Sequence, residues 1–189
     1  MKIKSILGLA AVGFALTSCQ SSSFQIKGFA QQLPEGDTIC LVADRQPETL
    51  LAMAVVNNGQ FLLTGETDST FLCRIYAKSQ PDNGVMFFLE PGNITAELNK
   101  YPTFSRVSGT KINNEWQHLN DSIQLLGAEL IRLSEASTIN DSNSHPNNYK
   151  AIDSLHHRMS DCILNTAQRN NSNALGRYLQ ETYKEPEFK

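Results

Sequence analysis

The chain has 189 residues, with 16 Lys and Arg against 19 Asp and Glu, a formal net charge of −3 at pH 7, and 40% hydrophobic residues. This length suits one ordinary domain, or one domain with a small appendage, and is large enough to bury a core. The excess of acid, with no basic stripe, argues against nucleic acid as a partner.

The chain begins with the layout of a secretory signal. Lys2 and Lys4 precede an apolar run, residues 6–16, that is too short to cross the ~30 Å hydrocarbon core as a stable helix. The run ends in Leu16-Thr17-Ser18-Cys19, which resembles the lipobox cut by the bacterial lipoprotein signal peptidase. The alternative is an ordinary N-terminal core helix with one buried cysteine, but the polar residues that follow Cys19 favour the signal.

The lipobox resemblance implies a signal peptide at 1–18 and a tether at 19–23 whose Cys19 carries lipid, palmitate included. Acyl chains hold a protein on a membrane because each buried methylene contributes about 0.8 kcal/mol. Gln20 stands where many inner-membrane lipoproteins have Asp, and the tether lacks the acidic cluster of surface-exported lipoproteins. We therefore expect an outer-membrane lipoprotein on the periplasmic face.

Residues 24–109 are expected to form a β-rich module. Short β-prone segments alternate with turn signals, and Asn57-Asn58-Gly59 is a strong hairpin signal because Asn and Gly accept the positive φ of tight turns. The expected strands are 24–30, 38–44, 52–56, 60–66, 71–78, 85–89, 94–98 and 104–107. Strands of this number and spacing favour an antiparallel β-sandwich or an open barrel.

Cys40 and Cys73 lie in two of these apolar segments. An oxidising periplasm permits a disulfide between them, although nothing in the local sequence requires it. The alternative is that both are small residues buried in the core. No two of the four cysteines form a Cys-x-x-Cys pair, so a thioredoxin-type dithiol is absent.

Residues 110–189 are expected to be helical, which makes the fold α+β. From Ile112 to Leu133 apolar residues recur at alternating steps of four and three, the pattern of a helix packed lengthwise on a partner. Thr110 is the expected N-cap. We predict a loop at 134–148, a second helix at 147–170 that completes an antiparallel hairpin, and a short helix at 173–183.

Five phrases of the β-rich module resemble the envelope-lipoprotein family called domain of unknown function 4369 (DUF4369). They are Phe24-Gln25-Ile26-Lys27-Gly28, Gly36-Asp37-Thr38-Ile39-Cys40-Leu41, Val55-Val56-Asn57-Asn58-Gly59-Gln60-Phe61, Phe87-Phe88-Leu89-Glu90-Pro91-Gly92-Asn93-Ile94 and Val107-Ser108-Gly109-Thr110-Lys111-Ile112-Asn113. In that family the module commonly precedes a thioredoxin-like or peroxiredoxin domain. This sequence stops at Lys189, about where such a domain would begin, so no residue of this sequence corresponds to the family's catalytic residues.

Two groups of polar residues invite a catalytic or metal interpretation. His118, Asp121 and Ser122 have the residue types of a hydrolase triad, but all three lie on one helix and lack an oxyanion hole. Asp153, His157 and Asp161 follow helical spacing, yet they lie opposite the apolar seam, where polar residues are usually only solvated. We expect no enzyme activity, no metal and no cofactor.

The chain also carries three Asp-Ser/Thr-aliphatic tripeptides. They resemble the acceptor of the O-glycosylation system found in the Gram-negative bacteria where this lipoprotein family is common. The resemblance implies that Thr38, Ser122 and Ser154 are candidate O-glycosylation sites.

Two functions remain open. The first is a lipid-anchored, non-enzymatic interaction or ligand-binding module that docks another envelope protein. The second is an accessory or truncated N-terminal module of a thiol-disulfide oxidoreductase or peroxiredoxin-like system. For that function Cys162 is the best candidate thiol, because it lies on a helix outside the β-rich module.

Overall fold

The computed structural model describes residues 22–139 and 145–183. The expected signal peptide at 1–18, the lipidated Cys19 and the tether as far as residue 21 lie outside the described residues. The strands are β1 (Ser23–Phe29), β2 (Thr38–Ala43), β3 (Gln46–Val55), β4 (Gln60–Glu66), β5 (Phe71–Ala77), β6 (Gln80–Leu89), β7 (Gly92–Glu97) and β8 (Arg106–Ser108). The helices are α1 (Lys111–Ile139), α2 (His145–Arg169) and α3 (Ala174–Thr182).

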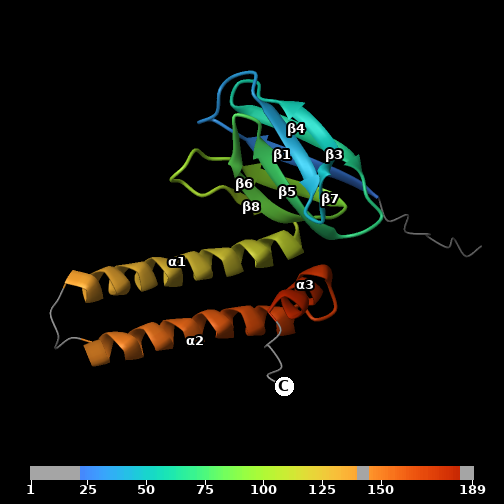
Figure 1. Cartoon of the computed structure of the whole chain (residues 1–189). Helices are drawn as coiled ribbons and strands as arrows, with labels where there is room; N and C mark the ends of the chain where they lie inside the picture. Colours follow the sequence, from blue (N-terminus) through green and yellow to red (C-terminus); the bar gives the residue numbers. More distant parts are fainter. Residues whose placement is uncertain (1–21, 140–144, 184–189) are drawn as a thin grey trace, which may run out of the picture.

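The strands form two four-stranded sheets that pack as an open sandwich and not as a closed barrel (Figure 1). Sheet 1 has the order β4-β1-β7-β8, and sheet 2 has the order β3-β2-β5-β6. The α+β expectation is therefore confirmed. Pairing is antiparallel except between β1 and β7, which run parallel.

The sandwich core comes from the alternation of inward and outward side chains along each strand. Ile26, Leu41, Ile75 and Ile94, one from each of four strands, are at most 1% exposed and belong to one apolar cluster. Burying side chains of this kind stabilises the fold by about 1.5–3 kcal/mol each. The sandwich therefore has a core of its own, separate from the helices.

The predicted hairpin turn forms, but it does not make a hairpin. Asn58 and Gly59 have φ of 50° and 69°, and Asn57 and Gln60 form a single bridge. Beyond that bridge β3 pairs with β2 in sheet 2 and β4 pairs with β1 in sheet 1. The local turn residues set the chain reversal, whereas the burial of the apolar faces decides which sheet each strand joins.

The first half of α1 covers one edge of each sheet. The Asn113 side chain accepts from the Phe88 N–H (2.8 Å) and donates to the Phe88 carbonyl oxygen (2.8 Å), both on edge strand β6. Trp116 Nε1 donates to the Met86 carbonyl oxygen (2.8 Å) on the same strand. Gln117 Oε1 accepts from the Val107 N–H (2.9 Å) on β8, the edge of sheet 1. These side chains satisfy backbone groups that an edge strand otherwise leaves unpaired.

The two long helices form the predicted antiparallel hairpin beneath the sandwich (Figure 1). The Asn113 N–H donates to Thr110 Oγ1 (3.4 Å), so the expected N-cap is confirmed. The predicted loop at 134–148 is wrong at both ends, because α1 runs to Ile139 and α2 begins at His145. The first turn of α2 accepts Pro146, since a proline there removes an N–H that has no intrahelical partner. None of the helices in the described ranges is long and apolar enough to span a membrane.

Candidate functional site

A cleft of about 310 Å³ lies between the sandwich and α3. Leu72 and Phe88 of sheet 2 form its apolar part, and Phe71, which packs on the sandwich core, also lines it. Charged residues come from both sides, with Asp44 and Arg45 after β2, and Arg177 and Glu181 on α3. The cavity has the size of a small-molecule site at the lower end of the usual range.

One ion pair spans the mouth of this cleft. Arg45 Nη2 lies 3.1 Å from Glu181 Oε2, with the two side chains 85% and 59% exposed. A pair this exposed contributes about 0–1 kcal/mol, so it can open at little cost. Tyr178 lies deeper on the same helix, and burial raises the pKa of its hydroxyl although a hydrogen bond with Thr182 partly offsets this.

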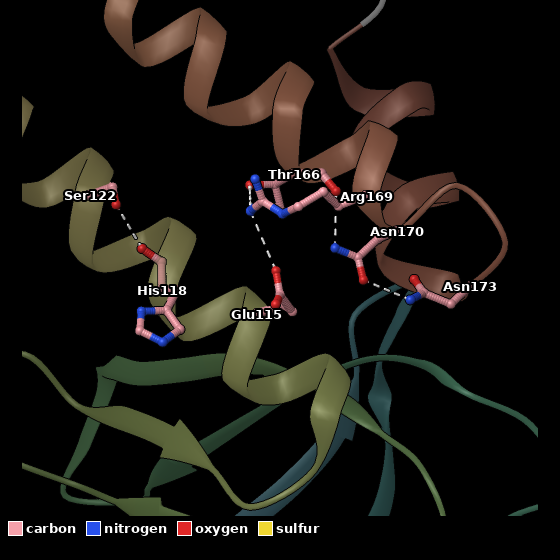
Figure 2. Close-up of polar contacts among 7 residues, drawn as sticks. All are labelled: Glu115, His118, Ser122, Thr166, Arg169, Asn170 and Asn173. Carbon is pink, nitrogen blue, oxygen red and sulfur yellow. Dashed lines mark hydrogen bonds and ion pairs between the residues drawn. The ribbon is translucent and has the colours of Figure 1, made fainter.

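A second, polar groove of about 230 Å³ lies between α1 and α2 (Figure 2). Its lining includes His118 and Ser122 of α1 and Cys162, Thr166 and Arg169 of α2. The Arg169 Nη2 contacts Glu115 Oε2 (3.4 Å) and Thr166 Oγ1 (3.2 Å), which ties the two helices together. The polar contacts of this groove therefore hold the hairpin rather than present a free charge.

The polar contacts in Figure 2 continue into the turn before α3. Asn170 Nδ2 donates to the Thr166 carbonyl oxygen (3.0 Å), and Asn173 Nδ2 donates to Asn170 Oδ1 (2.8 Å). Asn173 Oδ1 in turn accepts from the Gly176 N–H (3.2 Å) as the N-cap of α3. This chain of amides sets the position of α3, and hence of one wall of the cleft.

The geometry does not assemble a hydrolase triad from His118, Asp121 and Ser122. The Ser122 hydroxyl donates to the His118 backbone carbonyl (2.9 Å), not to its ring. Asp121 instead accepts from Arg106 (2.6 Å) and from Gln117 (2.8 Å). Partial burial acts to raise the pKa of the Asp121 carboxyl, but these hydrogen bonds lower it below its usual value.

The structure does not bring Cys40 and Cys73 together. Both are buried and free. The β2–β5 register places Cys40 opposite Tyr76 and Cys73 opposite Ala43, and only Cys73 belongs to the core cluster. Residues an odd number of positions apart on paired strands face opposite sides of a sheet, so this geometry fits two separately buried thiols and not a disulfide.

The thiols differ in their surroundings. Burial raises the pKa of Cys73 to about 12, which leaves its thiol unreactive. Cys162 is only half-buried and lines the groove between α1 and α2. It is therefore the most accessible thiol in the part of the chain that the structure describes.

The remaining candidate residues lie apart from one another. His157 Nε2 and Asp153 Oδ2 are 3.5 Å apart on the exposed face of α2, and no group of three metal-ligating side chains occurs in residues 22–139 and 145–183. Of the glycosylation candidates, Thr38 and Ser122 are half-buried and Ser154 is exposed. Ser154 is thus the most accessible acceptor.

Sequence reasoning missed the outer edge of sheet 2. In β3 the side chains of Ala52 and Ala54 pack against the core, while Met53 and Val55 are 58% and 59% exposed. Leu50 and Leu51 of the same strand are exposed as well. The prediction began this strand at residue 52, so it left out the first six residues of the edge.

The family resemblance is confirmed by comparison with known proteins. A family model described as "Domain of unknown function (DUF4369)" matches residues 24–116. The match covers both sheets and the first turns of α1, where Asn113 and Trp116 contact β6. A search of curated proteins finds no match.

Proposed function

From the DUF4369 domain formed by residues 24–116, we propose that the protein is a lipid-anchored, non-enzymatic periplasmic interaction module of the bacterial envelope. The proposal places the anchor at Cys19, in the outer membrane. The lipobox-like sequence supports the anchor, and the exposed edge of sheet 2 supports the interaction.

The observation that carries the proposal is the contrast between the two sides of the sandwich. On one side α1 satisfies backbone groups of β6 and β8 through Asn113, Trp116 and Gln117. On the other side β3 is the last strand of sheet 2, and among the described residues nothing pairs with its outer edge. A protein that covers one edge and leaves the opposite edge open offers a template for an added strand.

The side chains of β3 suit a partner better than solvent. Leu50, Leu51, Met53 and Val55 are all exposed, and no charged residue occurs between Glu48 and the end of the strand at Val55. Exposed edge strands of soluble proteins usually carry lysine or another charge that blocks pairing. An added strand would bury several of these side chains, each worth about 1.5–3 kcal/mol when fully buried.

A lysine in β3 tests this interaction. We expect Met53→Lys to abolish a crosslink to an envelope partner in intact native cells, because the charge opposes strand pairing. Leu164→Lys is the matched control, since Leu164 is 55% exposed but lies on α2. Quantitative mass spectrometry of crosslinked partners measures both. Equal partner recovery with Met53→Lys and with wild type would overturn the β3 interface.

The anchor is tested separately by Cys19→Ala. We expect this variant to move from the membrane fraction to the soluble fraction and to lose the mass of the lipid. If the variant stays in the membrane fraction, the lipid anchor is wrong even if the β3 interaction holds.

The redox accessory function has one observation in its favour, namely the half-buried Cys162 that lines the groove between α1 and α2. This function predicts fast alkylation of Cys162 in the folded protein. It also predicts a mixed disulfide between Cys162 and a thioredoxin-like protein, and the Cys162→Ser variant should not form that disulfide. Alkylation of Cys162 as slow as that of the buried Cys40 would rule out the redox accessory function.

A further inference from the structure

The cleft between the sandwich and α3 combines an apolar wall with separate charges. Leu72 and Phe88 form the apolar wall on sheet 2, and Phe88 also packs edge-to-face on Tyr178 with ring centroids 6.0 Å apart. The walls therefore belong to two elements that are firmly joined. A preformed cavity binds a ligand without the loss of conformational entropy that ordering a flexible site would cost.

The charges of the cleft are arranged so that two of them remain unpaired. Arg45 pairs with Glu181 at the mouth. Asp44, from the sandwich side, and Arg177, from α3, line the same cavity. Among the described residues neither of these two has an ion-pair partner, and they do not pair with each other. The cleft thus presents one anion and one cation on opposite walls.

We infer that this cleft binds a small zwitterion, a free apolar α-amino acid. Arg177 would take the carboxylate, because a guanidinium donates two parallel hydrogen bonds to a carboxylate. Asp44 would accept from the ammonium group. The apolar side chain of the ligand would lie against Leu72 and Phe88, where it leaves water.

Three properties of the cleft favour this class over others. A volume of about 310 Å³ is small for a folded segment or a lipid chain but suits a single amino acid. An anionic ligand without an ammonium group would leave Asp44 facing the ligand's negative charge. A cationic ligand without a carboxylate would leave Arg177 facing its positive charge. This site is distinct from β3, so it goes beyond the proposed strand-docking function.

The test is isothermal titration calorimetry of the full chain, purified in detergent, with L-phenylalanine, L-leucine and L-methionine. We expect saturable binding of at least one of the three. For L-phenylalanine, the comparison ligands are 3-phenylpropanoate, which lacks the ammonium group, and phenethylamine, which lacks the carboxylate. Each should bind at least tenfold more weakly than the amino acid itself.

Two variants assign the charges to residues. We expect Arg177→Gln and Asp44→Asn each to weaken amino-acid binding at least tenfold. Arg158→Gln, a charge loss at an exposed position of α2, should bind as wild type does. Both tested residues are exposed, so the variants should fold, and circular dichroism checks this.

Three results would overturn the inference. They are the absence of saturable binding for all three amino acids, equal affinity for 3-phenylpropanoate or phenethylamine, and unchanged affinity in both Arg177→Gln and Asp44→Asn. None of them bears on β3, which the crosslinking of Met53→Lys tests by itself.

Discussion

At the scale of single residues, two aromatic rings of the core lie directly over glycines of the neighbouring strand. Gly28 pairs with Phe61 and Gly65 pairs with Phe24 between β1 and β4. A Cβ placed on Gly28 would lie 1.9 Å from Phe61 Cζ, closer than any real contact. The ring occupies the space that a side chain would take, so glycine is required there by close approach.

This packing makes Gly28 sensitive to the smallest substitution. We expect Gly28→Ala to lower the free energy of unfolding by about 1–3 kcal/mol, because Phe61 must move from its place in the core. Gly127→Ala is the control, since nothing lies within 4 Å of a Cβ at that helical position. It should raise the free energy of unfolding by about 0.5–1 kcal/mol. Urea denaturation measures both, and equal effects would contradict the packing argument.

Glu90 gives the fold a dependence on pH. Burial raises the pKa of the Glu90 carboxyl, a hydrogen bond with Thr110 partly offsets the rise, and its Oε1 is buried with no hydrogen-bond partner among the described residues. A raised pKa in the folded state means that the folded protein binds this proton more tightly than the unfolded chain does. The free energy of unfolding therefore falls as pH rises from the usual Glu pKa through the raised value.

Replacing this carboxyl by an amide removes the ionisation. We expect Glu90→Gln to be more stable than wild type at pH 7 and to lose that advantage as the pH falls through the raised pKa of Glu90 towards the usual Glu pKa. Denaturant titrations at pH 4 and pH 7 measure the difference. A stability difference that stays the same at both values would show that ionisation of Glu90 is not its cause.

At the scale of elements, the joint between α1 and the sandwich depends on hydrogen bonds rather than on area alone. Asn113 is fully buried and pairs with both backbone groups of Phe88. Without it, those groups would face an apolar interface with no partner. An unsatisfied buried group costs about 1–3 kcal/mol, more than the hydrogen bond itself contributes.

Asn113→Ala should therefore be more destabilising than the few side-chain atoms it removes would suggest. We expect a loss of about 2–4 kcal/mol in the free energy of unfolding, because both polar groups of Phe88 lose their partner. Asn120→Ala, on the same helix but half-buried and without a contact of this kind, should change it by at most about 0.5 kcal/mol. Thermal denaturation of the two variants compares them, and similar losses would refute the role of Asn113.

At the scale of the whole molecule, the sandwich and the helices are joined by a second apolar cluster. Phe88, Trp116 and Tyr178 meet pairwise edge-to-face, with centroid distances of 5.8, 6.0 and 5.8 Å. The rings come from β6, α1 and α3, so their contacts join these three elements. On α1 this cluster reaches Ile123. Beyond that point the helical hairpin extends away from the sandwich, and α1 and α2 lie alongside each other only (Figure 1).

The free end of the hairpin should open more easily than its base. We expect backbone amides at 124–133 and 149–158 to exchange hydrogen faster than those at 112–123 and 159–169, because the distal halves pack on one partner instead of several. Hydrogen exchange followed by mass spectrometry resolves these segments. Equal protection along both helices would mean that the hairpin opens as one unit with the sandwich.

Much of this architecture could be predicted because its signals are local. The period-two segments and the turns at Asn58 and Gly59 located the strands, and the steps of three and four from Ile112 located α1. The helix ends near residues 134–148 were missed because polar residues do not break a helix as glycine does. The open edge of β3 was missed because periodicity does not reveal which strands lie at the edge of a sheet.

The sequence by itself determined the α+β class, the DUF4369 resemblance, the Thr110 cap and the alternation that builds the core, since each depends on residues close together in the chain. Only the tertiary structure decided that β3 and β4 join different sheets and that Cys40 and Cys73 face opposite sides of one sheet. It also decided that Asp44 and Arg177 line one cleft. The physical reason is that strand order and helix docking follow from burying apolar faces far apart in the sequence, where every pairing competes with every other.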